Sequence, residues 1–171
     1  MGSDEIRQAI QAATDYLRQN PDEARYTDSA ATASLVRGLV VRVTGSAGES
    51  VTTDMSPSVG GTAAAPSPGW LLRAAEASCV ATLIAMRAAM MGITLDALEV
   101  VVDSESDDRG ILGMDETVPP GPLSGRVMVR LGAQGVERAT LEAVAAWGIR
   151  HCPVHDALAR PVLMTTRVAT D

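Results

Sequence analysis

The chain has 171 residues, which suits a single domain, and its net charge of −7 gives no electrostatic basis for binding nucleic acid. All 14 basic residues are arginine, which excludes mechanisms that need a Schiff-base or P-loop lysine. Hydrophobic residues make up 46% of the chain, but Phe is absent and aromatics total 2%, so the core must be built from small side chains. Such a core buries little area on its own, and we therefore expect an oligomer.

The N-terminal segment predicts an amphipathic helix and no export signal. Ser3 is a suitable N-cap, apolar residues follow at helical spacing, and Asn20–Pro21 ends the pattern. We expect residues 1–24 to form an accessory helix. Because no signal peptide or long uncharged apolar run is present, we expect a cytoplasmic protein that does not bind membranes.

The stretch from Pro66 to Ile93 predicts a long central helix. Pro68 suits the first turn, and Gly92 is placed to end the helix. Between them the only charged residues are Arg73, Glu76 and Arg87. A helix with so narrow a polar sector is expected to be covered on most sides.

The rest of the chain alternates between strand pairs and helices. The first pair is predicted at 31–44 and 50–55, and the second at 95–103 and 126–131, where an acidic loop at 104–123 connects the strands. A helix at 136–150, a short helical turn to 158 and a last strand at 162–168 follow. Antiparallel strand pairs separated by helices predict an α+β fold.

The two cysteines are the first candidates for chemistry. Cys79 lies on an apolar stripe of the central helix, and Cys152 extends the inner stripe of the 136–150 helix. Two inward thiols on packed helices can meet as a redox pair, or each can simply fill space in the core. Cys152 precedes Pro153, a natural helix start that favours a thiolate, whereas Glu76 disfavours one at Cys79. From the residues alone, Cys152 is the better nucleophile.

His151 and His155 flank Cys152 and raise the possibility of a metal site. One helical turn is too crowded to supply three tetrahedral ligands, so we expect neither a metal nor a cofactor. We interpret His151 as a residue that ends its helix and His155 as a surface residue. The acidic residues of 103–115 fit no calcium-binding template and predict a solvated loop.

Two segments, PSPGWLLRAAEASC at 66–79 and HCPVHDAL at 151–158, resemble the OsmC/Ohr family, the osmotically inducible protein C and organic hydroperoxide resistance proteins. The family has a proline that opens a long helix, a cysteine further along it, and a second cysteine in a Cys-Pro turn far downstream. The resemblance implies an OsmC-like domain over residues 25–171 and an intertwined homodimer with active sites at the dimer interface.

The resemblance also implies roles for the cysteines. Cys79 would attack an organic hydroperoxide, Cys152 would resolve the sulfenic acid as a disulfide, and a dithiol reductant would restore both thiols. Peroxidase members commonly have Glu where this chain has Gly69, and an Arg in the first hairpin turn, which here reads TGSAGE at 44–49.

These departures leave two functions open. Arg42, or failing it Arg37, would supply the positive charge near Cys79, and Glu76 is the nearest replacement carboxylate. The alternative is an OsmC-fold protein that binds a small apolar molecule without peroxidase turnover.

Overall fold

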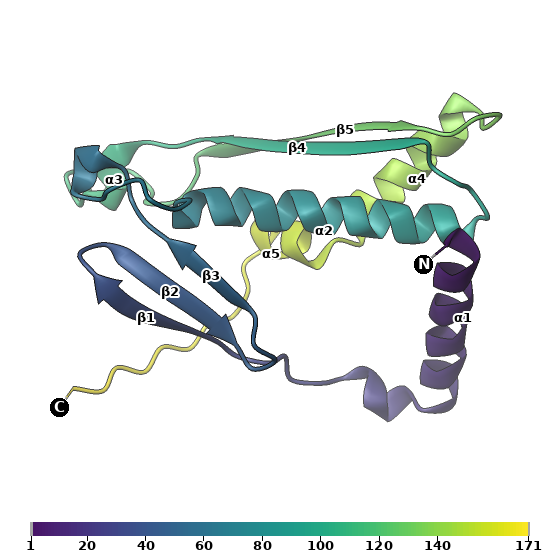
Figure 1. The fold of residues 1–171 in the computed structure, drawn as a ribbon, viewed down its shortest axis with the longest axis horizontal. Helices are drawn as coiled ribbons and strands as arrows, with labels where there is room; N and C mark the ends of the chain where they lie inside the picture. The colour runs from purple at the N-terminus through teal and green to yellow at the C-terminus, as the bar shows by residue number, and fades with distance from the viewer. Residues whose placement is uncertain (1, 171) are drawn as a thin grey trace. The chain divides into compact units, whose positions relative to one another are not determined.

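A computed structural model describes residues 2–170, drawn in Figure 1. By internal packing the chain forms two compact units. The first unit is Gln8–Ala75, and the second is the chain from Glu76 onward together with the residues up to Arg7. Helix α1 (Ser3–Gln19) begins with Asp4 and Glu5 in its first turn, and a 3-10 turn, η1 (Pro21–Ala24), follows it. The predicted N-terminal helix is therefore present, and none of its described residues is buried.

The first unit contains an antiparallel sheet in the order β1-β2-β3, formed by β1 (Ala31–Arg37), β2 (Val40–Gly45) and β3 (Ser50–Thr53). The single strand predicted over 31–44 is wrong, because the chain turns back between β1 and β2. Gly38 makes this turn possible with a φ of 49°, a conformation that disfavours residues with a side chain.

Helix α2 (Pro68–Met90) confirms the predicted central helix and both of its boundaries. Ser67 Oγ accepts from Trp70 N at 3.1 Å and caps the start, while Gly92, with a φ of 70°, turns the chain away at the end. The buried residues of α2 are Glu76, Val80, Ile84, Ala88 and Ala89. Length and composition alone would let α2 span a membrane, but the core helix of a soluble protein passes the same test.

The second unit contains one antiparallel pair, β4 (Ala97–Glu105) and β5 (Ser124–Gly132), which lies alongside α2 (Figure 1). Leu98 pairs with Leu131, and the strands alternate so that one face packs on the core cluster. The inward residues are Leu98, Val100, Val127, Val129 and Leu131. This is the alternation that the sequence predicted.

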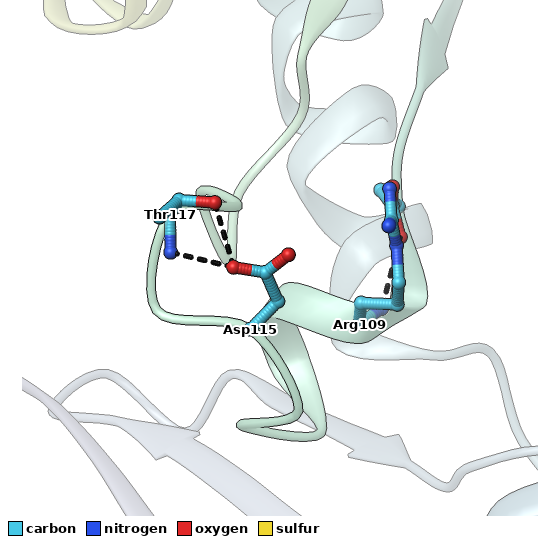
Figure 2. A network of polar contacts seen from close by, with 4 residues as sticks. Arg109, Asp115 and Thr117 are labelled. Atoms are coloured by element: carbon cyan, nitrogen blue, oxygen red, sulfur yellow. Dashed lines mark hydrogen bonds and ion pairs between the residues drawn. The ribbon is translucent and has the colours of Figure 1, made fainter.

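The loop between β4 and β5 contains a short helix, α3 (Asp108–Ile111), and is ordered by its own acidic side chains. Asp107 accepts from Arg109 N at 3.0 Å and pairs with the Arg109 guanidinium at 2.5 Å. Figure 2 shows Asp115, which accepts from the backbone N and the Oγ1 of Thr117 at 2.9 and 2.6 Å. These carboxylates accept hydrogen bonds from residues two positions further along the loop and so stabilise its turns, as expected for a solvated loop.

Helices α4 (Arg138–Arg150) and α5 (Pro153–Ala159) complete the second unit. Helix α4 crosses α2 at Gly148, where a Cβ atom would lie 2.8 Å from the backbone nitrogen of Ile84. The core cluster at this crossing consists of Val80, Ile84, Ala88, Val144 and Cys152. A residue without a side chain therefore sets the closeness of the two helices.

The predicted last strand at 162–168 is wrong for the chain as described, because residues 161–170 contain no strand. Leu163, Met164 and Val168 are 93%, 80% and 81% exposed. Alternating apolar residues give a strand its propensity, but a strand also needs an edge to pair with. None of the edges in residues 2–170 pairs with this segment.

Candidate thiol site

Cys152 lies at the start of α5 and is fully buried. It is the N-cap residue, and its Sγ accepts a hydrogen bond from the backbone N–H of His155 at 3.4 Å. Burial raises the pKa of the Cys152 thiol, the hydrogen bond from His155 opposes this effect, and the neighbouring Cys79 thiol adds to it. The helix start that the sequence predicted is present, but burial outweighs its preference for a thiolate.

Cys79 lies on α2, is partly exposed, and packs against the core cluster that contains Cys152. The side chains of the two cysteines interact, and both are free thiols. The more accessible sulfur therefore belongs to Cys79 and the enclosed one to Cys152. This difference suits Cys79 for meeting a substrate and Cys152 for reacting with a partner already inside the site.

A carboxylate and an imidazole lie beside the thiols. The side chain of Glu76 is 10% exposed, and its Oε1 accepts from Nδ1 of His155 at 2.7 Å. The interpretation of His155 as a surface residue holds only in part, because its side chain is 36% exposed but is bonded to a buried acid. Sequence reasoning missed the pair because Glu76 and His155 are 79 residues apart, and the only local signal was a charged residue on an apolar helix.

The other histidine has the role that the sequence predicted. His151 ends α4, its Nδ1 donates to the carbonyl oxygen of Trp147 at 2.8 Å, and its ring stacks on the Trp147 indole at 4.0 Å. Within residues 2–170, no three side chains of the metal-binding types are grouped to hold a metal ion.

The remaining predicted residues lie in the first unit. Arg37 ends β1 and Arg42 lies in β2, and both are exposed. The two strands are paired, and Arg42 lies opposite Ser34 of β1. Gly69 lies in the first turn of α2. A role for either arginine in activating Cys79 stays a prediction.

The fold and the site together define a class of protein: an α+β domain in which a long central helix brings one cysteine against a second cysteine at the start of a later helix. The family model of OsmC-like protein matches residues 60–167, and the chain belongs to this family. A comparison with curated protein sequences found no match.

Solved structures support the same fold. An OsmC-like protein from Mycoplasma pneumoniae is 17% identical with a TM-score of 0.66, over 79% of this chain and 89% of that one. A protein of osmotic stress and detoxification response from Psychrobacter arcticus is 18% identical with a TM-score of 0.62, over 78% and 90%. An organic hydroperoxide resistance protein from Legionella pneumophila is 20% identical with a TM-score of 0.57, over 78% and 90%. The predicted OsmC-like α+β fold is thus confirmed.

Proposed function

We propose that the protein is a thiol peroxidase that reduces organic hydroperoxides through Cys79 and Cys152. The observation that carries this proposal is the meeting of the two thiols, one partly exposed on α2 and one buried at the start of α5. The solved structures with this fold include organic hydroperoxide resistance proteins, which supports a role against peroxides.

The proposed reaction has two steps. The Cys79 thiolate attacks a peroxide oxygen, an S–O bond forms as the O–O bond breaks, and the alkoxide leaves as an alcohol after taking a proton. The Cys152 sulfur then attacks the Cys79 sulfenic acid, an S–S bond forms, and the hydroxide leaves as water with the proton of the Cys152 thiol. A dithiol reductant returns two electrons and two protons to the disulfide.

The surroundings of the thiols favour an apolar substrate. The core cluster beside Cys79 consists of aliphatic side chains, including Val80, Ile84 and Val144. An alkyl or lipid-like hydroperoxide gains by covering an exposed apolar side chain such as Leu72, which is 37% exposed and lies two turns before Cys79 on α2, whereas hydrogen peroxide does not. The proposal includes a cytoplasmic location, where a dithiol is available to reduce the disulfide.

The experiment is peroxide consumption with cumene hydroperoxide and a dithiol, in the parent and two cysteine variants. Cys79→Ser is expected to lose turnover by at least about a hundredfold, because the attacking nucleophile is removed. Cys152→Ser should react once, stop as a sulfenic acid and over-oxidise with excess peroxide. If Cys79→Ser reacts and Cys152→Ser does not, Cys152 is the attacker; if all three react no faster than free cysteine, the protein is not a peroxidase.

The second candidate function is binding of a small apolar molecule without turnover. Gly69 stands where peroxidase members commonly have Glu, and the turn at 44–49 contains no Arg. A thiol without these neighbours lacks the usual means of forming a thiolate. This candidate predicts saturable binding of cumyl alcohol or a fatty acid by a protein whose thiols stay reduced in hydroperoxide.

A further inference from the structure

Two side-chain contacts join α2 to α5, and they lie next to each other in antiparallel order. Glu76 lies one turn before Cys79 on α2, and His155 lies one turn after Cys152 on α5. The thiols interact with each other, and Nδ1 of His155 donates to Oε1 of Glu76 at 2.7 Å. The acid–imidazole pair is therefore a direct neighbour of the thiol pair and connects the same two helices.

The Glu76–His155 contact is too enclosed for a surface ion pair. The Glu76 side chain is 10% exposed, and a buried carboxylate is costly unless a partner satisfies it. His155 supplies that partner, and its backbone N–H also holds Cys152 Sγ at 3.4 Å. The His155 side chain therefore links α5 to α2, while the bond to the Cys152 sulfur comes from the backbone and is kept in both His155 variants.

The charges that face His155 make its protonation state matter. Glu76 faces it from α2, while on α5 the neighbouring groups are the Cys152 thiol and Asp156, which is paired with Arg160. A positive charge on His155 would pair with the Glu76 carboxylate, which lies one turn from Cys79 on α2.

We propose that His155, held by Glu76, is a positioning residue for the resolving step, in which Cys152 attacks an oxidised Cys79. Its side chain holds α5 against α2 through Glu76 and so keeps Cys152 within reach of Cys79. In that step the S–S bond forms, the bond from the Cys79 sulfur to its leaving group breaks, and the Cys152 proton goes to the leaving group. The inference takes the peroxide substrate from the proposed function. The closeness of the two thiols comes from the structure and does not depend on that function.

The experiment follows formation of the Cys79–Cys152 disulfide between pH 5.5 and 8, with cumene hydroperoxide in one series and diamide in the other. Diamide first adds to one thiolate, and the second thiol then displaces it as the reduced hydrazine, so it tests the resolving step without a peroxide. His155→Phe removes the bond to Glu76. His155→Asn keeps an N–H donor for Glu76 but cannot be protonated.

With diamide, His155→Phe is expected to form the disulfide about tenfold more slowly, because the contact that holds α5 against α2 is lost. The ratio of the parent rate to the His155→Asn rate should rise as the pH falls from 8 to 5.5, because a histidine side chain can accept a proton and an asparagine side chain cannot. A purely structural role would leave that ratio constant. His151→Asn, at the other histidine of the chain, is the matched control and should follow the parent at every pH.

The inference is overturned if both His155 variants match the parent in rate and pH dependence, or if diamide gives the parent no intramolecular disulfide. If His155→Phe does not fold by circular dichroism, the pH ratio of His155→Asn decides. A parent that forms the disulfide with diamide but not with hydroperoxide refutes the peroxidase function, while the diamide rates still decide the role of His155.

Discussion

Asp54, in the first unit, is 1% exposed, and its carboxylate organises the loop that leads into α2. One oxygen accepts from Met55 N, and the other accepts from the N and Oγ1 of Thr62 and from Ala64 N. These hydrogen bonds, led by the Thr62 hydroxyl, lower the pKa of Asp54 from 3.8 to about 2. The loop is thus built around an ionised carboxylate.

We expect Asp54 to make the fold sensitive to acid. Its folded-state pKa is below the ordinary value, so its contribution to stability is complete above about pH 4 and is lost as the pH falls toward 2. Asp54→Asn should lower the melting temperature by several degrees at pH 7, because an amide nitrogen then faces a backbone donor. Its stability should also vary less between pH 5 and 2 than that of the parent.

Thermal unfolding across this pH range measures both effects. Asp107→Asn is a suitable control, because Asp107 also has a pKa of about 2 but pairs with Arg109 on an exposed loop. It should lower the melting temperature at pH 7 less than Asp54→Asn does. Equal melting temperatures for the parent and Asp54→Asn at pH 7 would contradict this account of the loop.

At this scale the sequence predicted single residues where the signal was local. Cys152 at a helix start and His151 at a helix end follow from their immediate neighbours. The Glu76–His155 bond spans 79 positions, and neither residue has a local pattern that identifies the other. The buried state of Cys152 likewise depends on helices that only the folded chain brings together.

At the scale of elements, Gly148 controls how α4 packs on α2. A Cβ atom there would lie 2.8 Å from Ile84 N and 3.0 Å from Ile84 Cα, and backbone atoms cannot rotate away as a side chain can. Gly148→Ala should therefore destabilise the protein by about 1–3 kcal/mol, the usual cost of overpacking. In the absence of this clash, the same change would stabilise a helix by about 1 kcal/mol, so the sign of the effect is informative.

Urea unfolding measures this change in the free energy of unfolding. Gly132→Ala is the control, because a Cβ atom at the end of β5 meets nothing within 4 Å. A more stable Gly148→Ala variant would show that the helices do not cross this closely.

The elements differ in how far sequence could predict them. Helix α2 is bounded by residues that act locally, Pro68 and Gly92, so its limits were predictable. The turn at Gly38 lies within a run of alternating residues, and the alternation on either side hid it. The segment 162–168 has the composition of a strand, but whether it pairs depends on an edge elsewhere.

At the scale of the whole molecule, the buried core is small. Among the described residues the buried hydrophobic side chains are six: Val80, Ile84, Ala88, Ala89, Val144 and Cys152. Large apolar side chains remain exposed, among them Leu35 at 70%, Trp70 at 51% and Met91 at 44%. A chain of this length normally buries more, and exposed apolar surface on this scale favours a partner.

We therefore expect a homodimer in which α2 of each chain contributes to a shared core. Light scattering at micromolar concentration should give twice the chain mass of 17.8 kDa. A single-chain mass under these conditions would contradict both the dimer and the account of the exposed side chains.

The central claim is that Cys79 and Cys152 of one chain react as a pair, and one measurement tests it most directly. The reduced protein is treated with one equivalent of cumene hydroperoxide, alkylated, digested and analysed by mass spectrometry. We predict that both thiols are lost together, that peptides containing Cys79 and Cys152 are joined by a disulfide, and that the oxidised protein keeps the mass of one chain, 17.8 kDa, under denaturing and non-reducing conditions. Recovery of both cysteines as alkylated thiols, after a reaction no faster than that of free cysteine, would contradict the claim.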